Sequence, residues 1–203
     1  MGVAFKLIKI GILGDIGSGK SFVAKQFGFP IFDADKEVAQ IYKNNKSCYK
    51  KIKKKFPKFI KSKIILKKEL GDIIEANKKN LKKISNIVHP IVRKKMNIFF
   101  IKNHKKKTVI LDIPLLVENK LFDKSFYLIF VQSNKKEINK RLKKRPFYNK
   151  NIIKSLRKSQ TSLEYKKKIS NCIIKNNFKL QTLKKRIKII KKKILDERNY
   201  NRY

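Results

Sequence analysis

Eight residues near the N-terminus have the types and spacing of a phosphate-binding loop. They are Gly14-Asp15-Ile16-Gly17-Ser18-Gly19-Lys20-Ser21. The pattern G-x-x-x-x-G-K-[ST] is filled at every fixed position. In such a loop the backbone amides surround phosphate oxygens, the lysine reaches the terminal phosphates and the hydroxyl ligates Mg²⁺. The apolar run 7–13 predicts a strand before the loop, and residues 22–27 predict a helix after it. We therefore expect the chain to bind a nucleoside triphosphate.

Two aspartates follow the loop at a distance that suits an acceptor site. Asp33 and Asp35 end a very short apolar run at residues 30–32. Phosphoryl transfer to an alcohol needs a carboxylate that holds or takes the hydroxyl proton. Alternatively, one aspartate caps a helix that starts near Lys36. We expect both roles, one for each residue, with Asp35 as the base, although the sequence leaves open which of the two contacts the acceptor.

Three further motifs could line or close the site. Asp112 ends another apolar run, where an acid can hold Mg²⁺ through water, and the turn at residues 114–118 after it could line a substrate. The pair His89-Pro90 predicts the boundary between two helices, where a histidine is more often structural than catalytic. Arg141 and Arg145 share one helical face and could close over a triphosphate, or could simply be solvated.

The composition limits the class of protein. The formal charge is +41, from 55 Lys and Arg against 14 Asp and Glu. Such a charge suits a polyanion partner, but the lysines are scattered and no aromatic nucleic-acid motif accompanies them, so we expect no specific nucleic acid. The apolar runs are too short to cross a membrane, and Cys48 and Cys172 have no metal spacing. These features favour a cytoplasmic protein, a monomer or a weak homo-oligomer.

The order of apolar and helical segments predicts an α/β fold. Strands are expected at residues 7–13, 30–32, 108–112, 126–131 and 172–174. Alternation with helices implies a parallel, doubly wound sheet. Residues 1–35, 106–133 and 169–203 would form the nucleotide-binding core. Residues 36–105 would form an inserted helical subdomain for the acceptor, and residues 134–168 a second helical excursion.

Taken together, the motifs resemble one family over residues 7 to about 195, namely dephospho-coenzyme A kinase. The glycine loop alone occurs in many families, whereas the set is specific. Its members are the loop, Asp33-Ala34-Asp35, His89-Pro90-Ile91, Pro114-Leu115-Leu116-Val117-Glu118, Arg141-Leu142 with Arg145, Gln160 and Ile173-Ile174-Lys175-Asn176.

The resemblance implies an adenylate-kinase-like P-loop fold in which residues 134–168 form a mobile lid. It implies transfer of the ATP γ-phosphate to the ribose 3′-hydroxyl of dephospho-coenzyme A, the last step of coenzyme A synthesis, with Mg²⁺. Lys20, Asp35 and Arg141 would be catalytic, and Ser21 would ligate the metal. The residues implied to hold ATP are Ile16, Gly17, Ser18, Gly19, Lys20 and Ser21. Those implied to border the acceptor are Asp33, His89, Pro114, Leu115 and Glu118.

The sequence departs from the family pattern at several places. Asp15 stands where the loop usually has a second glycine, so its carboxylate must point away from the triphosphate or lower the affinity. The Arg-Asp pair of the lid becomes Arg145-Pro146, and an Ala-Asp before the last strand becomes Ser170-Asn171. Two rival functions remain open: a kinase of the same fold with another small acceptor, and an NTPase that acts on RNA.

Overall fold

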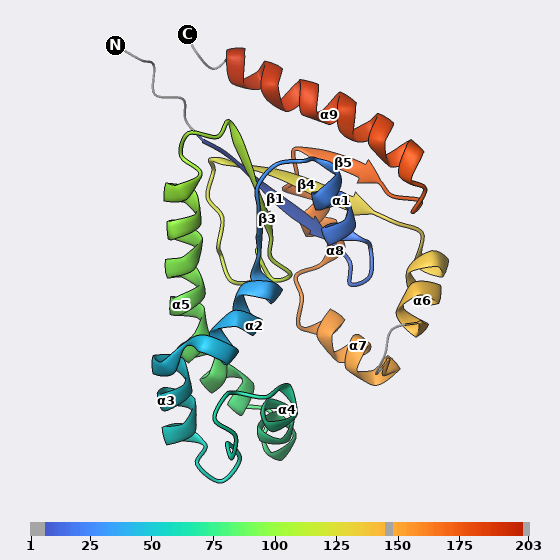
Figure 1. The fold of residues 1–203 in the computed structure, drawn as a ribbon. Helices are drawn as coiled ribbons and strands as arrows, with labels where there is room; N and C mark the ends of the chain where they lie inside the picture. Colours follow the sequence, from blue (N-terminus) through green and yellow to red (C-terminus); the bar gives the residue numbers. More distant parts are fainter. Residues whose placement is uncertain (1–6, 145–147, 201–203) are drawn as a thin grey trace. The chain divides into compact units, whose positions relative to one another are not determined.

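Five short apolar segments form a sheet with the strand order β2-β3-β1-β4-β5 (Figure 1). The computed structural model describes residues 7–144 and 148–200. The strands are β1 (Ile8–Gly14), β2 (Ile31–Asp33), β3 (Thr108–Asp112), β4 (Phe126–Gln132) and β5 (Cys172–Lys175). The pairings of β1 with β3 and β4, and of β4 with β5, are parallel. The expected parallel sheet flanked by helices is confirmed.

The chain divides into two compact units. The sheet unit comprises the residues up to Ile31 and those from Lys105 onward, and the helical unit comprises Phe32–His104. The helices of the sheet unit are α1 (Lys20–Gln26), α6 (Lys135–Lys143), α7 (Lys150–Lys158), α8 (Leu163–Lys168) and α9 (Leu180–Tyr200). Those of the helical unit are α2 (Ala34–Asn44), α3 (Lys46–Lys55), α4 (Lys67–Ala76) and α5 (Asn80–Lys102).

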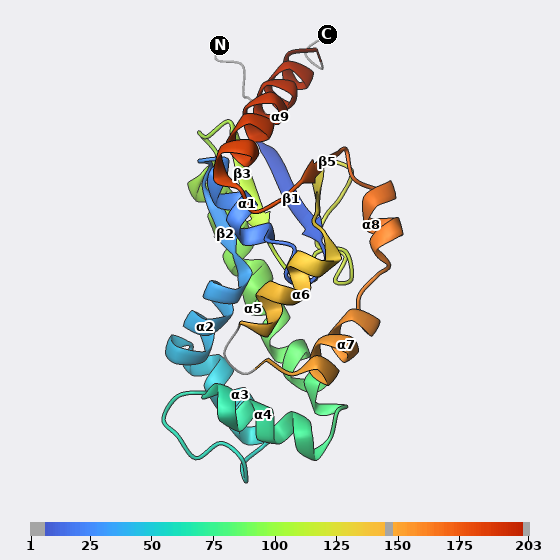
Figure 2. The ribbon, with the colours of Figure 1, turned by 90° about the vertical axis from the view of Figure 1, so that its right-hand side faces the viewer.

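The core of the sheet unit lies between one face of the sheet and two helices. Helices α1 and α9 lie side by side on that face (Figure 2). Because side chains alternate along a strand, Ile10 and Ile12 both point into this core. There they pack with Phe27, the C-cap of α1, and with Leu183 of α9. On the other face Gly11 permits a close approach, because a Cβ there would lie 2.6 Å from Leu116. The turn after β3 therefore packs directly on β1.

The helical unit is organised around α5, which contacts α2, α3 and α4. The buried side chains of α5 recur every four residues, which places them on one face. They are Asn80, Ile84, Val88, Val92 and Met96. In the described part of the chain, no helix is long and apolar enough to cross a membrane.

The expected helix boundary at His89-Pro90 is wrong, because Pro90 lies inside the continuous helix α5. Proline removes one backbone hydrogen bond and usually ends or kinks a helix. Here the buried face of α5 continues on both sides, at Val88 before the proline and at Val92 after it. We infer that burial of this face outweighs the lost hydrogen bond.

Candidate active site

The glycines of the phosphate loop are required by its backbone and its neighbours. Gly17 and Gly19 have φ of +83° and +87°, a region that side chains other than glycine rarely adopt. A Cβ on Gly17 would lie 2.9 Å from Leu142 of α6, and one on Gly19 would lie 2.6 Å from Asn176, which follows β5. The loop is thus held closely against α6 and the end of β5.

The loop is also anchored through Ser18, which is fully buried. Its carbonyl oxygen accepts hydrogen bonds from Asn176 Nδ2 and from the hydroxyl of Ser133, each at 2.9 Å. Ser133 and Asn176 follow β4 and β5, so the carboxyl ends of three neighbouring strands meet at the loop. These contacts tie the loop to the ends of β4 and β5.

Lys20 closes the loop on itself. Its Nζ donates to the carbonyl oxygens of Gly14 at 3.2 Å and Asp15 at 2.9 Å. The Asp15 carbonyl also accepts the Ser18 amide at 3.2 Å. The ammonium group therefore lies at the mouth of the loop, where it would face terminal phosphates.

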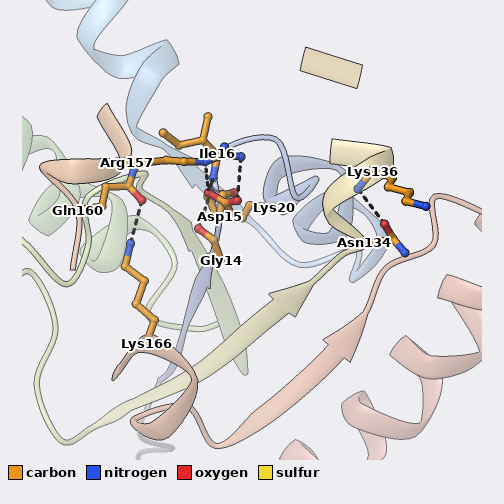
Figure 3. A network of polar contacts seen from close by, with 9 residues as sticks. All are labelled: Gly14, Asp15, Ile16, Lys20, Asn134, Lys136, Arg157, Gln160 and Lys166. Carbon is orange, nitrogen blue, oxygen red and sulfur yellow. Dashed lines mark hydrogen bonds and ion pairs between the residues drawn. The ribbon is translucent and has the colours of Figure 1, made fainter. Parts of the chain in front are cut away.

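The Asp15 carboxylate turns toward α7 and forms an ion pair with Arg157. Arg157 Nε donates to Asp15 Oδ1 at 3.1 Å and Arg157 Nη2 donates to Oδ2 at 3.0 Å (Figure 3). Oδ1 also accepts the Ile16 amide at 2.6 Å. The acid that departs from the family pattern is thus neutralised within the protein.

Arg141 projects from α6 next to the loop. Its guanidinium lies 4.3 Å from the centre of the Phe178 ring, a cation–π contact. The same ring would lie 3.0 Å from a Cβ on Gly19. One aromatic side chain therefore connects Arg141 with the phosphate loop, while Arg145 lies outside the described residues.

The turn after β3 carries three of the expected acceptor residues. Pro114 and Leu115 are exposed, whereas Leu116 is buried. Glu118 accepts the Thr161 amide at 2.9 Å and pairs with Lys166 of α8 at 2.8 Å. Desolvation raises the pKa of Glu118. The hydrogen bond and positive charge of Lys166, together with the Thr161 amide, have the larger effect and hold the pKa of Glu118 below its usual range.

The remaining expected residues belong to the helical unit. Asp33 is the N-cap of α2, and its Oδ1 accepts the Lys36 amide at 3.0 Å. Asp35 lies in the first turn of α2 and is exposed. His89 is half-buried on α5, where desolvation and the nearby positive charge of Arg93 lower its pKa. One aspartate is thus a helix cap, as the sequence allowed, which leaves the role of Asp35 a prediction.

Within the sheet unit, the structure brings together the loop, Lys20 and Arg141. The sequence analysis named Asn176 only as part of a family motif and gave no supporting role to it, to Ser133 or to Arg157. Asn176 gave a weak signal, because a polar residue directly after a buried strand lies at the ligand edge of a parallel sheet. Arg157 gave another, as an arginine in a chain whose basic residues are mostly lysine. Their partners are distant in sequence and could not be deduced.

The residues present fit a nucleotide and a magnesium ion. The glycines leave the loop without side chains at the positions where amides would meet phosphates. Ser21, in the first turn of α1, is exposed and offers a hydroxyl oxygen, a ligand type that Mg²⁺ prefers. Among residues 7–144 and 148–200, no group of three His, Cys, Asp or Glu could hold a metal by itself.

A family model and two curated relatives all indicate the same family. A family model described as dephospho-CoA kinase matches residues 8–182. A dephospho-CoA kinase of Fusobacterium nucleatum is 35% identical over 188 residues, covering 88% of this chain and 94% of the relative. One of Wolbachia pipientis is 34% identical over 170 residues, covering 81% and 87%.

Two solved structures are similar along nearly the whole chain. A dephospho-CoA kinase from Campylobacter jejuni has a TM-score of 0.64 at 26% identity, covering 93% of this chain and 98% of that one. A Thermus thermophilus protein has a TM-score of 0.76 at 26% identity, covering 92% and 97%.

Proposed function

The chain belongs to the dephospho-CoA kinase family, and we propose how its residues and substrates take part in the family reaction. This reaction is the phosphorylation of dephospho-coenzyme A, the last step of coenzyme A biosynthesis. The phosphoryl donor is ATP, used with Mg²⁺, and the acceptor is the ribose 3′-hydroxyl. The observation that carries the proposal is the phosphate loop closed by Lys20 at the carboxyl end of β1.

In the proposed reaction, the acceptor oxygen bonds to the γ-phosphorus as the bond to the β–γ bridging oxygen breaks and ADP leaves. Asp35 accepts the hydroxyl proton, or orients the hydroxyl until transfer has begun. Lys20, the loop amides and Arg141 stabilise the charge that develops on the phosphoryl oxygens. Ser21 would hold Mg²⁺, which would further neutralise the phosphates when bound.

The acceptor site is proposed from the positions that match the family motifs. The residues at these positions are Asp33, His89, Pro114, Leu115 and Glu118. The exposed Pro114 and Leu115 are free to meet an apolar part of the acceptor. Desolvation and the charge of Arg93 lower the pKa of His89, which favours the neutral ring, so we propose that it acts as a hydrogen-bonding group rather than a cation.

We also propose the functional division of the chain. Residues 36–105 bind the acceptor, and residues 134–168 act as the lid over ATP. The high positive charge favours the approach of two phosphate-bearing substrates. A cytoplasmic location would keep the thiols of Cys48 and Cys172 reduced.

The test is ADP release by purified protein with ATP and Mg²⁺, in the presence and absence of dephospho-coenzyme A. We expect acceptor-dependent turnover and a product that carries one additional phosphoryl group on the ribose 3′-oxygen, located by NMR. Equal rates with and without the acceptor would contradict the proposal. Stimulation by RNA instead, at near-physiological salt, would indicate the rival NTPase.

A further inference from the structure

Asp15 places a carboxylate in the loop that is expected to receive a triphosphate. It lies between Gly14 and Ile16 in the phosphate loop, and its carbonyl oxygen is held by both Lys20 and Ser18. These two hydrogen bonds hold the Asp15 backbone on the loop. A carboxylate here would oppose the charge of a triphosphate unless another group neutralises it.

Arg157 is built to neutralise this carboxylate. Its guanidinium donates one hydrogen bond to each carboxylate oxygen of Asp15, at 3.1 and 3.0 Å. This two-point arrangement combines charge with a fixed geometry, which a lysine ammonium could not reproduce. The Asp15 side chain is only 13% exposed, so solvent shields its charge poorly.

The ion pair also gives Arg157 a partner other than ATP. Figure 3 shows the guanidinium directed at Asp15 beside the loop, and Lys20 directed at the loop carbonyls. Lys158, the next residue of α7, is exposed and has the same sign of charge. Arg157 thus differs from the other basic residues of α7 in its position and in its two hydrogen bonds to one carboxylate, and not in its charge.

We propose that Arg157 is a positioning residue for ATP, which acts by neutralising Asp15 on the phosphate loop rather than by contacting the triphosphate. This inference rests on the proposed use of ATP. With Arg157 removed, the uncompensated carboxylate lowers ATP affinity. With Asp15 made neutral as well, the need for Arg157 disappears.

The experiment measures the dissociation constant of ATP with Mg²⁺ by calorimetry for four variants and the unaltered protein. Arg157→Ala should raise Kd about tenfold, which corresponds to about 1.4 kcal/mol. Asp15→Asn should bind within about threefold of the unaltered protein, and the double variant should return to that range. Lys158→Ala removes a neighbouring charge on the same helix and should leave Kd unchanged.

Each other pattern overturns the inference. A double variant as weak as Arg157→Ala would show that Arg157 contacts the phosphates directly. Asp15→Asn as weak as Arg157→Ala would show that the pair acts only as a structural link between α7 and the loop. If Arg157→Ala does not fold, Arg157→Gln in the presence and absence of Asp15→Asn makes the same comparison.

Kinetics separate this inference from the proposed function. At saturating ATP, Arg157→Ala should keep kcat within about twofold while the KM for ATP rises, because only ground-state binding is altered. Absence of ATP binding by the unaltered protein would overturn the proposed nucleotide and this inference together. Normal ATP binding without rescue by Asp15→Asn would overturn this inference alone.

Discussion

The ammonium group of Lys166 lies 2.8 Å from a carboxylate oxygen of Glu118, and only 2% of the Lys166 side chain is exposed. The same ammonium donates to Gln160 Oε1 at 3.1 Å. Because Lys166 belongs to α8 and Glu118 to the turn after β3, the pair joins the end of the proposed lid segment to that turn. A family motif residue thus has a structural partner in addition to its proposed acceptor role.

Replacement of Lys166 by methionine should destabilise the protein by about 3 kcal/mol, because it leaves the Glu118 carboxylate without its cation. The free energy of unfolding in urea measures this loss. The double variant with Glu118→Gln should recover most of it, since no uncompensated charge is then buried. If the double variant is as unstable as Lys166→Met, packing of the lysine stem matters more than its charge.

Glu69 should make the helical unit sensitive to acid. Its carboxylate accepts hydrogen bonds from the amides of Lys61, Ser62 and Leu66 and from the Ser62 hydroxyl. Desolvation raises the pKa of Glu69, but these hydrogen bonds outweigh it and lower the pKa to about 2 from an ordinary 4.5. A carboxyl whose folded pKa is depressed stabilises the protein above its unfolded pKa and loses that contribution as pH falls.

We therefore expect Glu69→Gln to lower the free energy of unfolding by about 1–3 kcal/mol at pH 7. The difference from the unaltered protein should shrink from pH 4.5 toward pH 2, the interval between the two pKa values. Glu75→Gln, at an exposed position of the same helix, is the matched control. A pH-independent difference would indicate that the neutral acid holds the loop as well as the carboxylate does.

Local features of the site could be predicted from the sequence, whereas its long-range supports could not. The strand, loop and helix around Lys20 follow from one continuous motif, since each element is specified by adjacent residues. The pairing of Asp15 with Arg157 joins positions 142 residues apart. Only the folded chain reveals such partners, because any of the many basic residues could have met that carboxylate.

Pro90 illustrates the other limit of sequence interpretation. A proline usually ends or kinks a helix, so the sequence predicts a helix boundary at Pro90. This prediction is wrong because α5 buries one continuous face on both sides of the proline. Tertiary burial, which depends on α2, α3 and α4, decided the outcome. Asp33 is the opposite case, since capping of α2 depends on a neighbour only three residues away.

Gly17→Ala should weaken ATP binding at least about tenfold and destabilise the fold by about 1–2 kcal/mol. The alanine would have to adopt the left-handed backbone that Gly17 has in the loop, with φ of +83°. Its Cβ would also lie 2.9 Å from Leu142. Gly71→Ala is a matched control, because its added Cβ on α4 would have no atom within 4 Å apart from its chain neighbours and the backbone of its own helix. Calorimetric titration and thermal melting measure both effects. Unchanged affinity in Gly17→Ala would show that the loop conformation is not what ATP requires.

Lys20→Ala should reduce kcat by about a hundredfold or more while the melting temperature changes little. The ammonium would stabilise charge on the transferred phosphoryl group, and in the free protein it is held by two carbonyls of the loop. Lys25→Ala, at the exposed last turn of the same helix, removes an equal charge and should leave kcat unchanged. Near-normal turnover in Lys20→Ala would reject the loop as the site of transfer.

The roles of the two aspartates at the start of α2, the N-cap Asp33 and the first-turn Asp35, can be separated by isosteric amides. Asparagine is as good an N-cap as aspartate, so Asp33→Asn should preserve stability and test only the charge at that position. We expect Asp35→Asn to lower kcat by about a hundredfold with little change in the KM for dephospho-coenzyme A, as removal of a proton acceptor requires. Steady-state kinetics of both variants decide the assignment. A larger kcat loss in Asp33→Asn would give the role of base to the capping residue, and a rise in KM alone for Asp35→Asn would make it a binding group.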